Sequence, residues 1–132
     1  MDHHSAGDRP DRPGPAEYFT GDVTLTPIIE APLPAQLRAL SVTFQPGART
    51  AWHTHPRGQT IFVTAGEGRA QRRGGPVITL KPGDTVFFHP DEEHWHGAAP
   101  DAEMTHVAMQ EADDSGTHVT WLDHVSDADY TA

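Results

Sequence analysis

The chain has 132 residues, enough for one domain with a single enclosed core. Nineteen acidic against nine basic side chains give a net charge of −10, and no basic stripe is present, so we expect neither nucleic acid nor a membrane as a partner. The sequence contains no cysteine, which excludes disulfides, thiolate nucleophiles and cysteine zinc sites. It also shows no signal-peptide core and no apolar run long enough to span a bilayer, so we predict a cytoplasmic protein.

Residues 1–16 differ in composition from the rest of the chain. They hold Pro10, Pro13, Pro15 and several charges, with almost nothing apolar. Such a segment cannot bury enough surface to offset the entropy of ordering it. We therefore predict a disordered or loosely ordered tail over 1–16 and one folded domain over 17–132.

Glycine and proline punctuate the domain, and short alternating or β-branched runs lie between them. This rhythm predicts an all-β sandwich or barrel. One stretch, Asp123–Tyr130, is suited to a short C-terminal helix, with Asp123 as its N-cap. The expected strands are Val23–Ile29, Leu37–Phe44, Thr50–His55, Thr60–Ala65, Gly68–Arg72, Val77–Leu80, Thr85–His89, His94–Ala98, Thr105–Glu111 and His118–Leu122.

Two of these strands carry patterned faces, because side chains alternate along a strand. The strand Leu37–Phe44 places Leu40, Val42 and Phe44 on one face. Along Glu103–Gln110, one face mixes apolar residues with groups that can bind metal or hydrogen-bond, as in the lining of a ligand cavity. The residues of that face are Met104, His106, Ala108 and Gln110. Taken alone, that second strand could also be half-buried with its polar residues outward.

The strongest chemical signal is the pair His53 and His55. Residues at i and i+2 point the same way only on an extended strand, and Pro56 and Gly58 exclude a helix here. Two adjacent imidazoles form half of a metal site, and Gln59 and His94 are the candidates to complete it.

Three imidazoles and one side-chain oxygen suit a divalent ion such as Mn, Fe, Ni, Cu or Zn. Glutamine is a neutral ligand, so it leaves the full metal charge available as a Lewis acid and favours non-redox chemistry. Because the Pro56–Gly58 turn separates Gln59 from the histidines, parity alone does not place it. Gln59 could instead be a polar neighbour of the site, with water as the fourth ligand.

These spacings resemble the cupin superfamily. Glutamine stands where the first cupin motif usually has glutamate, and Glu92 stands where the second commonly has glycine. The residues that match are Gly47, His53, His55, Gln59 and Gly66 in the first motif, and Gly83 and His94 in the second. The resemblance implies a single-domain cupin β-barrel of the jelly-roll type.

Most of the chain after the tail is similar to the small bacterial manganese-dependent cupin hydroxynitrile lyases. The similarity is carried by segments such as Pro46–Pro56, Val63–Gly66, His94–Pro100 and Met104–His106. It implies reversible cleavage of a cyanohydrin to an aldehyde or ketone plus HCN, and a homo-oligomer, either dimer or tetramer. It also implies one divalent metal per chain, manganese first, with iron, nickel or zinc as alternatives, bound by His53, His55, Gln59 and His94.

Cyanohydrin cleavage needs a base for the hydroxyl proton, and a neutral imidazole suits that role near neutral pH. His96 shares the face of His94 and is our candidate for the base. His106, the second catalytic candidate, would donate hydrogen bonds with Gln110 to cyanide or the carbonyl. An apolar pocket for the small-molecule substrate would be formed by Leu40, Val42, Phe44 and Ala108.

Two other functions fit the same residues. The first is a metal-dependent dioxygenase that cleaves C–C bonds oxidatively, and the second is a non-catalytic cupin that binds a small molecule.

Trp52 and Trp95 have the opposite parity to the ligands, so we expect them on the outside of the sheet or at a subunit contact. His118 and His124 belong to no motif and are expected to be solvated.

Overall fold

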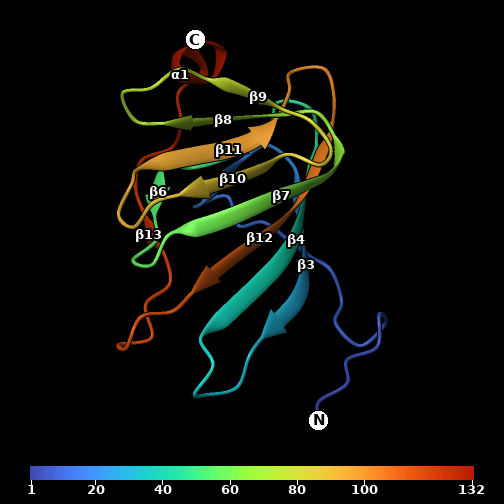
Figure 1. Ribbon diagram of the computed structural model, residues 1–132. Helices are drawn as coiled ribbons and strands as arrows, with labels where there is room; N and C mark the ends of the chain where they lie inside the picture. The colour runs from blue at the N-terminus through green and yellow to red at the C-terminus, as the bar shows by residue number, and fades with distance from the viewer.

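The computed structural model describes residues 1–132, which form two facing antiparallel β-sheets and one five-residue helix (Figure 1). No helix is long enough to cross a bilayer. The elements are β1 (Arg12–Pro13), β2 (Phe19–Thr20), β3 (Val23–Glu30), β4 (Leu37–Phe44), β5 (Arg49–Thr50), β6 (His53–Thr54), β7 (Gln59–Gly66), β8 (Gly68–Arg72), β9 (Ile78–Leu80), β10 (Thr85–Phe88), β11 (His94–Ala98), β12 (Met104–Glu111), β13 (Thr120–Trp121) and α1 (Asp127–Thr131).

The first sheet has the strand order β1-β3-β4-β12-β7-β10. The second has the order β13-β6-β11-β5-β2, with β8 added beside β11 and β9 beside β8. In Figure 1, β8, β9 and β11 lie at the end of the molecule that carries α1, and β3 and β4 extend to the opposite end. The predicted all-β, single-domain barrel with a short C-terminal helix is confirmed.

The apolar core lies between the two sheets. Phe44, Ile61, Val63 and Met104 are fully buried there, and burying a side chain of this size stabilises a fold by about 1.5–3 kcal/mol. Alternate residues of β12 are buried in the order expected from the sequence. The core occupies the Phe44–Met104 end of the β4–β12 pair, and the polar pair Arg38–Gln110 lies near its other end.

Several predicted boundaries are wrong. The expected strand Thr50–His55 is two short strands, β5 and β6. The backbone N–H groups of Ala51 and Trp52, which lie between them, donate to the carbonyls of Tyr18 and Asp123 instead of continuing one ladder. The expected strand His118–Leu122 contracts to β13.

The helix also begins later than predicted. It starts at Asp127, and its N-cap is Ser126, whose hydroxyl oxygen accepts a hydrogen bond from the Asp129 N–H at 3.1 Å. Asp123 is not the cap because its own backbone is held beside Trp52, through the bond from the Trp52 N–H to the Asp123 carbonyl.

The N-terminal segment lies along β3. Arg12 and Pro13 pair with Leu25 and Thr24, and the Thr26 hydroxyl donates to the Asp11 carboxylate at 2.7 Å. The Arg9 guanidinium donates to a carbonyl of the same strand, that of Ile28. Most side chains of residues 1–16 are exposed. The division of the chain at residue 16 stays a prediction.

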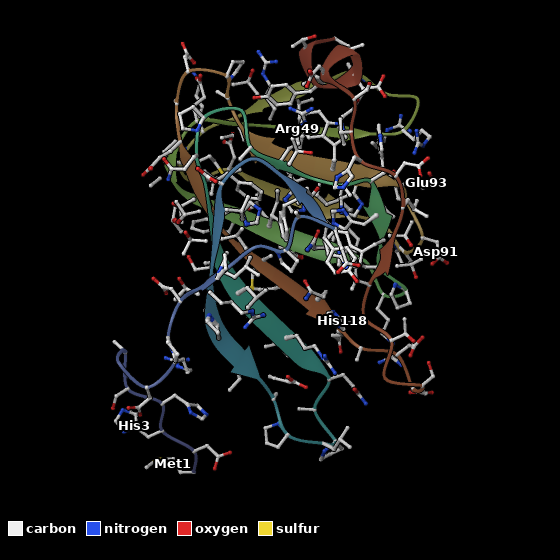
Figure 2. All side chains as sticks on the ribbon, turned by 180° about the vertical axis from the view of Figure 1, so that it is seen from behind. Met1, His3, Arg49, Asp91, Glu93 and His118 are labelled. Atoms are coloured by element: carbon white, nitrogen blue, oxygen red, sulfur yellow. The ribbon has the colours of Figure 1, made fainter.

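The outer face of the second sheet is covered by the C-terminal segment. Trp52, Trp95, Val125 and Tyr130 form a second buried cluster, as the parity of the two tryptophans predicted. Arg49 fixes this segment: its guanidinium donates to the Val125 carbonyl at 2.8 Å and lies 4.5 Å from the centre of the Tyr130 ring. Figure 2 shows Arg49 close to α1.

Candidate metal centre and active-site cavity

The predicted metal ligands converge because short strands bring them into register. His53 on β6 lies opposite His94 on β11, and Gln59 at the start of β7 lies opposite Gln110 on β12. His55 directly follows β6, and its ring centroid is 5.0 Å from that of His53. The inference that both imidazoles share one face is therefore confirmed, although the strand itself is shorter than expected.

Three of the imidazoles are held in one tautomer by backbone carbonyls. The Nδ1 atoms of His53, His55 and His94 lie 2.9, 2.6 and 2.8 Å from the carbonyl oxygens of Ala51, His118 and Glu92, respectively. A carbonyl oxygen only accepts, so each Nδ1 carries the proton and donates. Each Nε2 is consequently left with a lone pair that can bind a metal.

These lone pairs meet an amide oxygen at the centre of the site. The Gln59 amide nitrogen donates to Gln110 Oε1 at 3.2 Å, which turns Gln59 Oε1 toward His94 Nε2 at 3.0 Å. With His94 neutral, these two atoms are both acceptors. His55 Nε2 is buried with no hydrogen-bond partner. Facing acceptors without a proton between them are satisfied by a cation, so these residues fit a divalent metal ion.

Burial keeps the candidate ligands neutral. It lowers the pKa of His55 to about 4 and that of His94 to about 3. Burial also lowers the pKa of His53 well below its ordinary value, and the neighbouring His94 and His55 add to this effect. Nitrogens that stay unprotonated at neutral pH are ready metal ligands.

Two further histidines form a buried pair beside this centre. His106 Nε2 lies 2.8 Å from His96 Nδ1, and His96 Nε2 lies 3.1 Å from Gln59 Oε1. Burial lowers the pKa of His106 to about 4 and that of His96 well below its ordinary value, the latter with a contribution from His106. The structure thus brings both predicted catalytic residues to the predicted ligands.

A second grouping of ligands is also present. Ligand nitrogens of His53, His94 and His96 lie within 4.8 Å of one another, so a metal could be held by these three histidines. His55 differs from His96 in having a free Nε2, whereas both ring nitrogens of His96 have polar neighbours. The availability of His55 Nε2 favours the set His53, His55, Gln59 and His94, which stays a prediction.

A cavity of ≈ 270 Å³ opens onto this group of side chains. All five predicted substrate-contacting residues line it, namely Leu40, Val42, Phe44, Ala108 and Gln110. A cavity of this size accommodates a small-molecule substrate.

Several cavity residues lie outside the sequence-based set. His118 was expected to be solvated, which is wrong: it is half-buried, it lines the cavity, and its carbonyl holds His55. Tyr18 and Trp121 stack at 4.6 Å and form an aromatic wall, and the Trp121 ring is 4.8 Å from that of His53. No motif marks these residues, because contacts between distant segments bring them to the site: Trp121 through the pairing of β13 with β6, and Tyr18 through the hydrogen bond from the Ala51 N–H to its carbonyl.

Comparison with known proteins agrees with this geometry. Residues 40–109 match the cupin domain family. The chain is 55% identical over 130 residues to an (R)-mandelonitrile lyase of Granulicella tundricola, covering 98% of each chain. A cupin-like protein of Thermotoga maritima is 37% identical and superposes with a TM-score of 0.83, covering 98% of this chain and 95% of the other. A cupin-2 domain protein of Rhodospirillum rubrum shares the fold at 16% identity, with a TM-score of 0.73 over 99% and 84% of the two chains. The chain therefore belongs to the cupin family.

Proposed function

We propose that this protein is a metal-dependent hydroxynitrile lyase, which reversibly cleaves a cyanohydrin to an aldehyde or ketone and HCN. The observation that carries the proposal is the group of unprotonated ligand atoms beside the His96–His106 pair, at the wall of a largely apolar cavity. The 55% identity to an (R)-mandelonitrile lyase supports the same reaction class.

A divalent cation bound by His53, His55, Gln59 and His94 would supply Lewis acidity that lowers the pKa of the substrate hydroxyl. The amide of Gln59 cancels none of the metal charge, which suits this chemistry. We propose manganese as the ion, with iron, nickel and zinc as alternatives, since several divalent ions tolerate such ligands.

We propose that His96 takes the hydroxyl proton. When His96 Nδ1 donates to His106 Nε2, His96 Nε2 is free to accept a proton at the side of the site where Gln59 lies. The pair of electrons of the breaking C–C bond leaves with cyanide, and the carbonyl forms as the hydroxyl proton is lost. Because burial disfavours the charged imidazolium, His96 returns that proton to cyanide, and the product is neutral HCN.

Two neighbouring groups can orient the reactants. Gln110 accepts from Gln59 through Oε1, so its amide nitrogen is left to donate to the carbonyl or to cyanide. Leu40, Val42 and the aromatic residues of the wall contact the remaining substituent, which favours aryl or alkyl groups.

The first test is HCN release from racemic mandelonitrile by manganese-loaded protein. We expect release that disappears in metal-stripped protein and in the His53→Ala variant. No release from protein that binds metal stoichiometrically would overturn the proposal. In that case oxygen uptake with a phenolic or alkene substrate would indicate a dioxygenase, and tight ligand binding without turnover would indicate a binding protein.

We also propose a homo-oligomer in the cytoplasm. Strand β10 pairs on one side only, and Phe62 and Phe87 are 41% and 50% exposed, so a second copy could cover this region. Size-exclusion chromatography tests the assembly: elution as a 14.4 kDa monomer would contradict it. Fractionation of cells that produce the protein tests its location.

A further inference from the structure

Positive charge gathers in a hollow beside the active-site cavity, although the protein as a whole is acidic. The chain has nine basic against 19 acidic side chains, yet Arg9, Arg12 and Arg38 all line a hollow of ≈ 380 Å³ next to the cavity. We call these three arginines the cationic rim. The hollow and the cavity share four wall residues, Arg12, Leu40, Gln110 and His118.

Strand register connects this rim to the reacting centre. Arg38 on β4 lies opposite Gln110 on β12, and Gln110 lies opposite Gln59 on β7, so the three residues form one row across the sheet. Two strand spacings separate the ends of this row, about 10 Å between the backbones of Arg38 and Gln59. In Figure 2, His118, which lines the same hollow, lies beside the tip of β12. A substrate that reacts near Gln59 can therefore extend along this row toward the rim.

The positive charge of the rim is incompletely neutralised. Glu30 is the one carboxylate that lines the hollow; it lies 3.3 Å from the Arg38 guanidinium, and its side chain is 73% exposed. Asp11, on the same segment as Arg9 and Arg12, accepts from Thr26 and does not line the hollow.

The hollow also contains polar nitrogens that lack partners. Arg9 Nε is buried without a hydrogen-bond partner, and His118 Nδ1 is in the same condition. The Nε–H of arginine only donates, so Arg9 needs an acceptor at this place. An unpaired buried donor among several guanidinium groups indicates a site for an anionic ligand with oxygen acceptors.

We propose that the cationic rim binds a carboxylate carried by the substrate, at the end of the molecule away from the reacting carbon. The inference rests on the proposed function and narrows it: the preferred cyanohydrins derive from aldehydes or ketones with an anionic substituent. Guanidinium and carboxylate groups match in shape and charge, and the apolar wall between rim and centre accommodates the connecting carbon skeleton. Elsewhere the net charge of −10 repels such a substrate.

The experiment compares 3-formylbenzoate with benzaldehyde in cyanohydrin synthesis, as the ratio of their kcat/KM values. One charge-assisted hydrogen bond corresponds to about a tenfold change, so Arg38→Gln should lower this ratio about tenfold. Glu30→Gln should raise it, because the substitution removes the carboxylate that competes for Arg38. Arg12→Gln, a change at an exposed side chain, gives a second test should Arg38→Gln fail to fold.

The matched control is Arg57→Gln, which alters the net charge equally at a side chain that pairs with Asp114 and lines neither the hollow nor the cavity. A ratio that Arg38→Gln and Arg12→Gln leave unchanged would overturn the proposal. So would an equal decrease in Arg57→Gln, because the overall charge of the protein would then explain the preference.

A binding measurement separates this inference from the proposed reaction. Binding of 3-formylbenzoate is followed by quenching of tryptophan fluorescence, since Trp121 lines the cavity. If neither aldehyde is converted, the lyase proposal fails, whereas about tenfold weaker binding to Arg38→Gln would still support the rim. Suppose that benzoate binds as tightly as 3-formylbenzoate and does not compete with benzaldehyde. The rim would then bind the carboxylate of a separate ligand, and the proposal that it binds a substrate carboxylate would be overturned.

Discussion

Strands β6 and β11 present opposite chemistry on their two faces. Their inner face carries His53, His94 and His96, whose ring nitrogens lie close together. The Nε2 atoms of His94 and His96 face the acceptor Gln59 Oε1. On the outer face, Trp95 of β11 and Trp52, which directly precedes β6, pack with Val125 and Tyr130 under the C-terminal segment.

The rings of the two faces also differ in how well their polar atoms are satisfied. On the outer side, Trp95 Nε1 donates to Gln71 at 2.9 Å and the Tyr130 hydroxyl donates to the Ala98 carbonyl at 2.6 Å, although the Nε of Arg49 beside them is buried without a partner. On the inner side, His55 Nε2 and His106 Nδ1 are buried without partners. We infer that the outer face stabilises the fold. The buried unpaired nitrogens of the inner face cost folding free energy, which the outer face offsets, and they are arranged for binding.

The largest expected effect comes from the inner face. In His53→Ala, the loss of one candidate ligand should lower metal-dependent HCN release by about 10³-fold or more. Metal content per chain and the rate of HCN release from mandelonitrile are the measurements. His124→Ala, at an exposed histidine outside the site, is the matched control and should behave as wild type. Full activity in His53→Ala would remove this histidine from the site.

The outer face should affect stability instead. Trp95 is fully buried, and Trp95→Ala should lower the free energy of unfolding by about 3–5 kcal/mol. Urea unfolding of metal-free protein measures this change. We expect folded Trp95→Ala to retain one metal per chain at low temperature, and loss of metal from the folded variant would show that the two faces do not act separately.

The inner imidazoles should make the metal-free fold sensitive to acid. His55 and His106 have folded pKa values of about 4, and His94 of about 3, against an ordinary value of 6.5. At pH values between the folded pKa and 6.5, these histidines bind more protons in the unfolded chain than in the folded protein. The free energy of unfolding therefore decreases as the pH falls below about 6.5. Each such imidazole changes the free energy of unfolding by at most about 1.4 kcal/mol per pH unit.

Urea midpoints of metal-free protein at several values between pH 5 and pH 8 test this dependence. Above pH 6.5 these histidines should contribute no slope. His106→Gln should show a smaller slope below pH 6.5 than wild type, because one buried imidazole is missing. A flat profile between pH 5 and pH 6.5 would contradict burial of these neutral rings.

The smallest effect is expected for Tyr130→Phe on the outer face. The substitution removes the hydrogen bond to the Ala98 carbonyl and should lower the free energy of unfolding by about 1 kcal/mol. HCN release at 25 °C should not change. A decrease in activity without a decrease in stability would mean that Tyr130 positions the inner face.

Much of this architecture could be predicted from the sequence. The strands Leu37–Phe44, Gly68–Arg72 and His94–Ala98 occur with the predicted bounds, because alternation and flanking turn residues are local signals. The same alternation identified the buried positions of β12, and the glycine and histidine spacings indicated the family.

Other features depend on contacts between distant segments and could not be predicted. Thr50–His55 reads as one extended run, yet hydrogen bonds from its centre to Tyr18 and Asp123 divide it. His118 carries no motif, and its role arises because its carbonyl meets His55, 63 positions earlier in the chain. Likewise, the cationic rim joins the N-terminal segment to β4, which spacing cannot show.

The carbonyls that orient the three histidine ligands have a consequence for the evolution of the site. The acceptors on Ala51, Glu92 and His118 are main-chain oxygens, which every amino acid possesses. Mutations of these three side chains therefore leave the orienting groups in place, provided the backbone keeps its path. Glu92, at a position where the cupin motif commonly has glycine, presents its carbonyl to His94 in this way. The orientation of the ligands is robust to sequence drift at the positions that provide it, so these positions can acquire new side chains while the centre keeps its geometry.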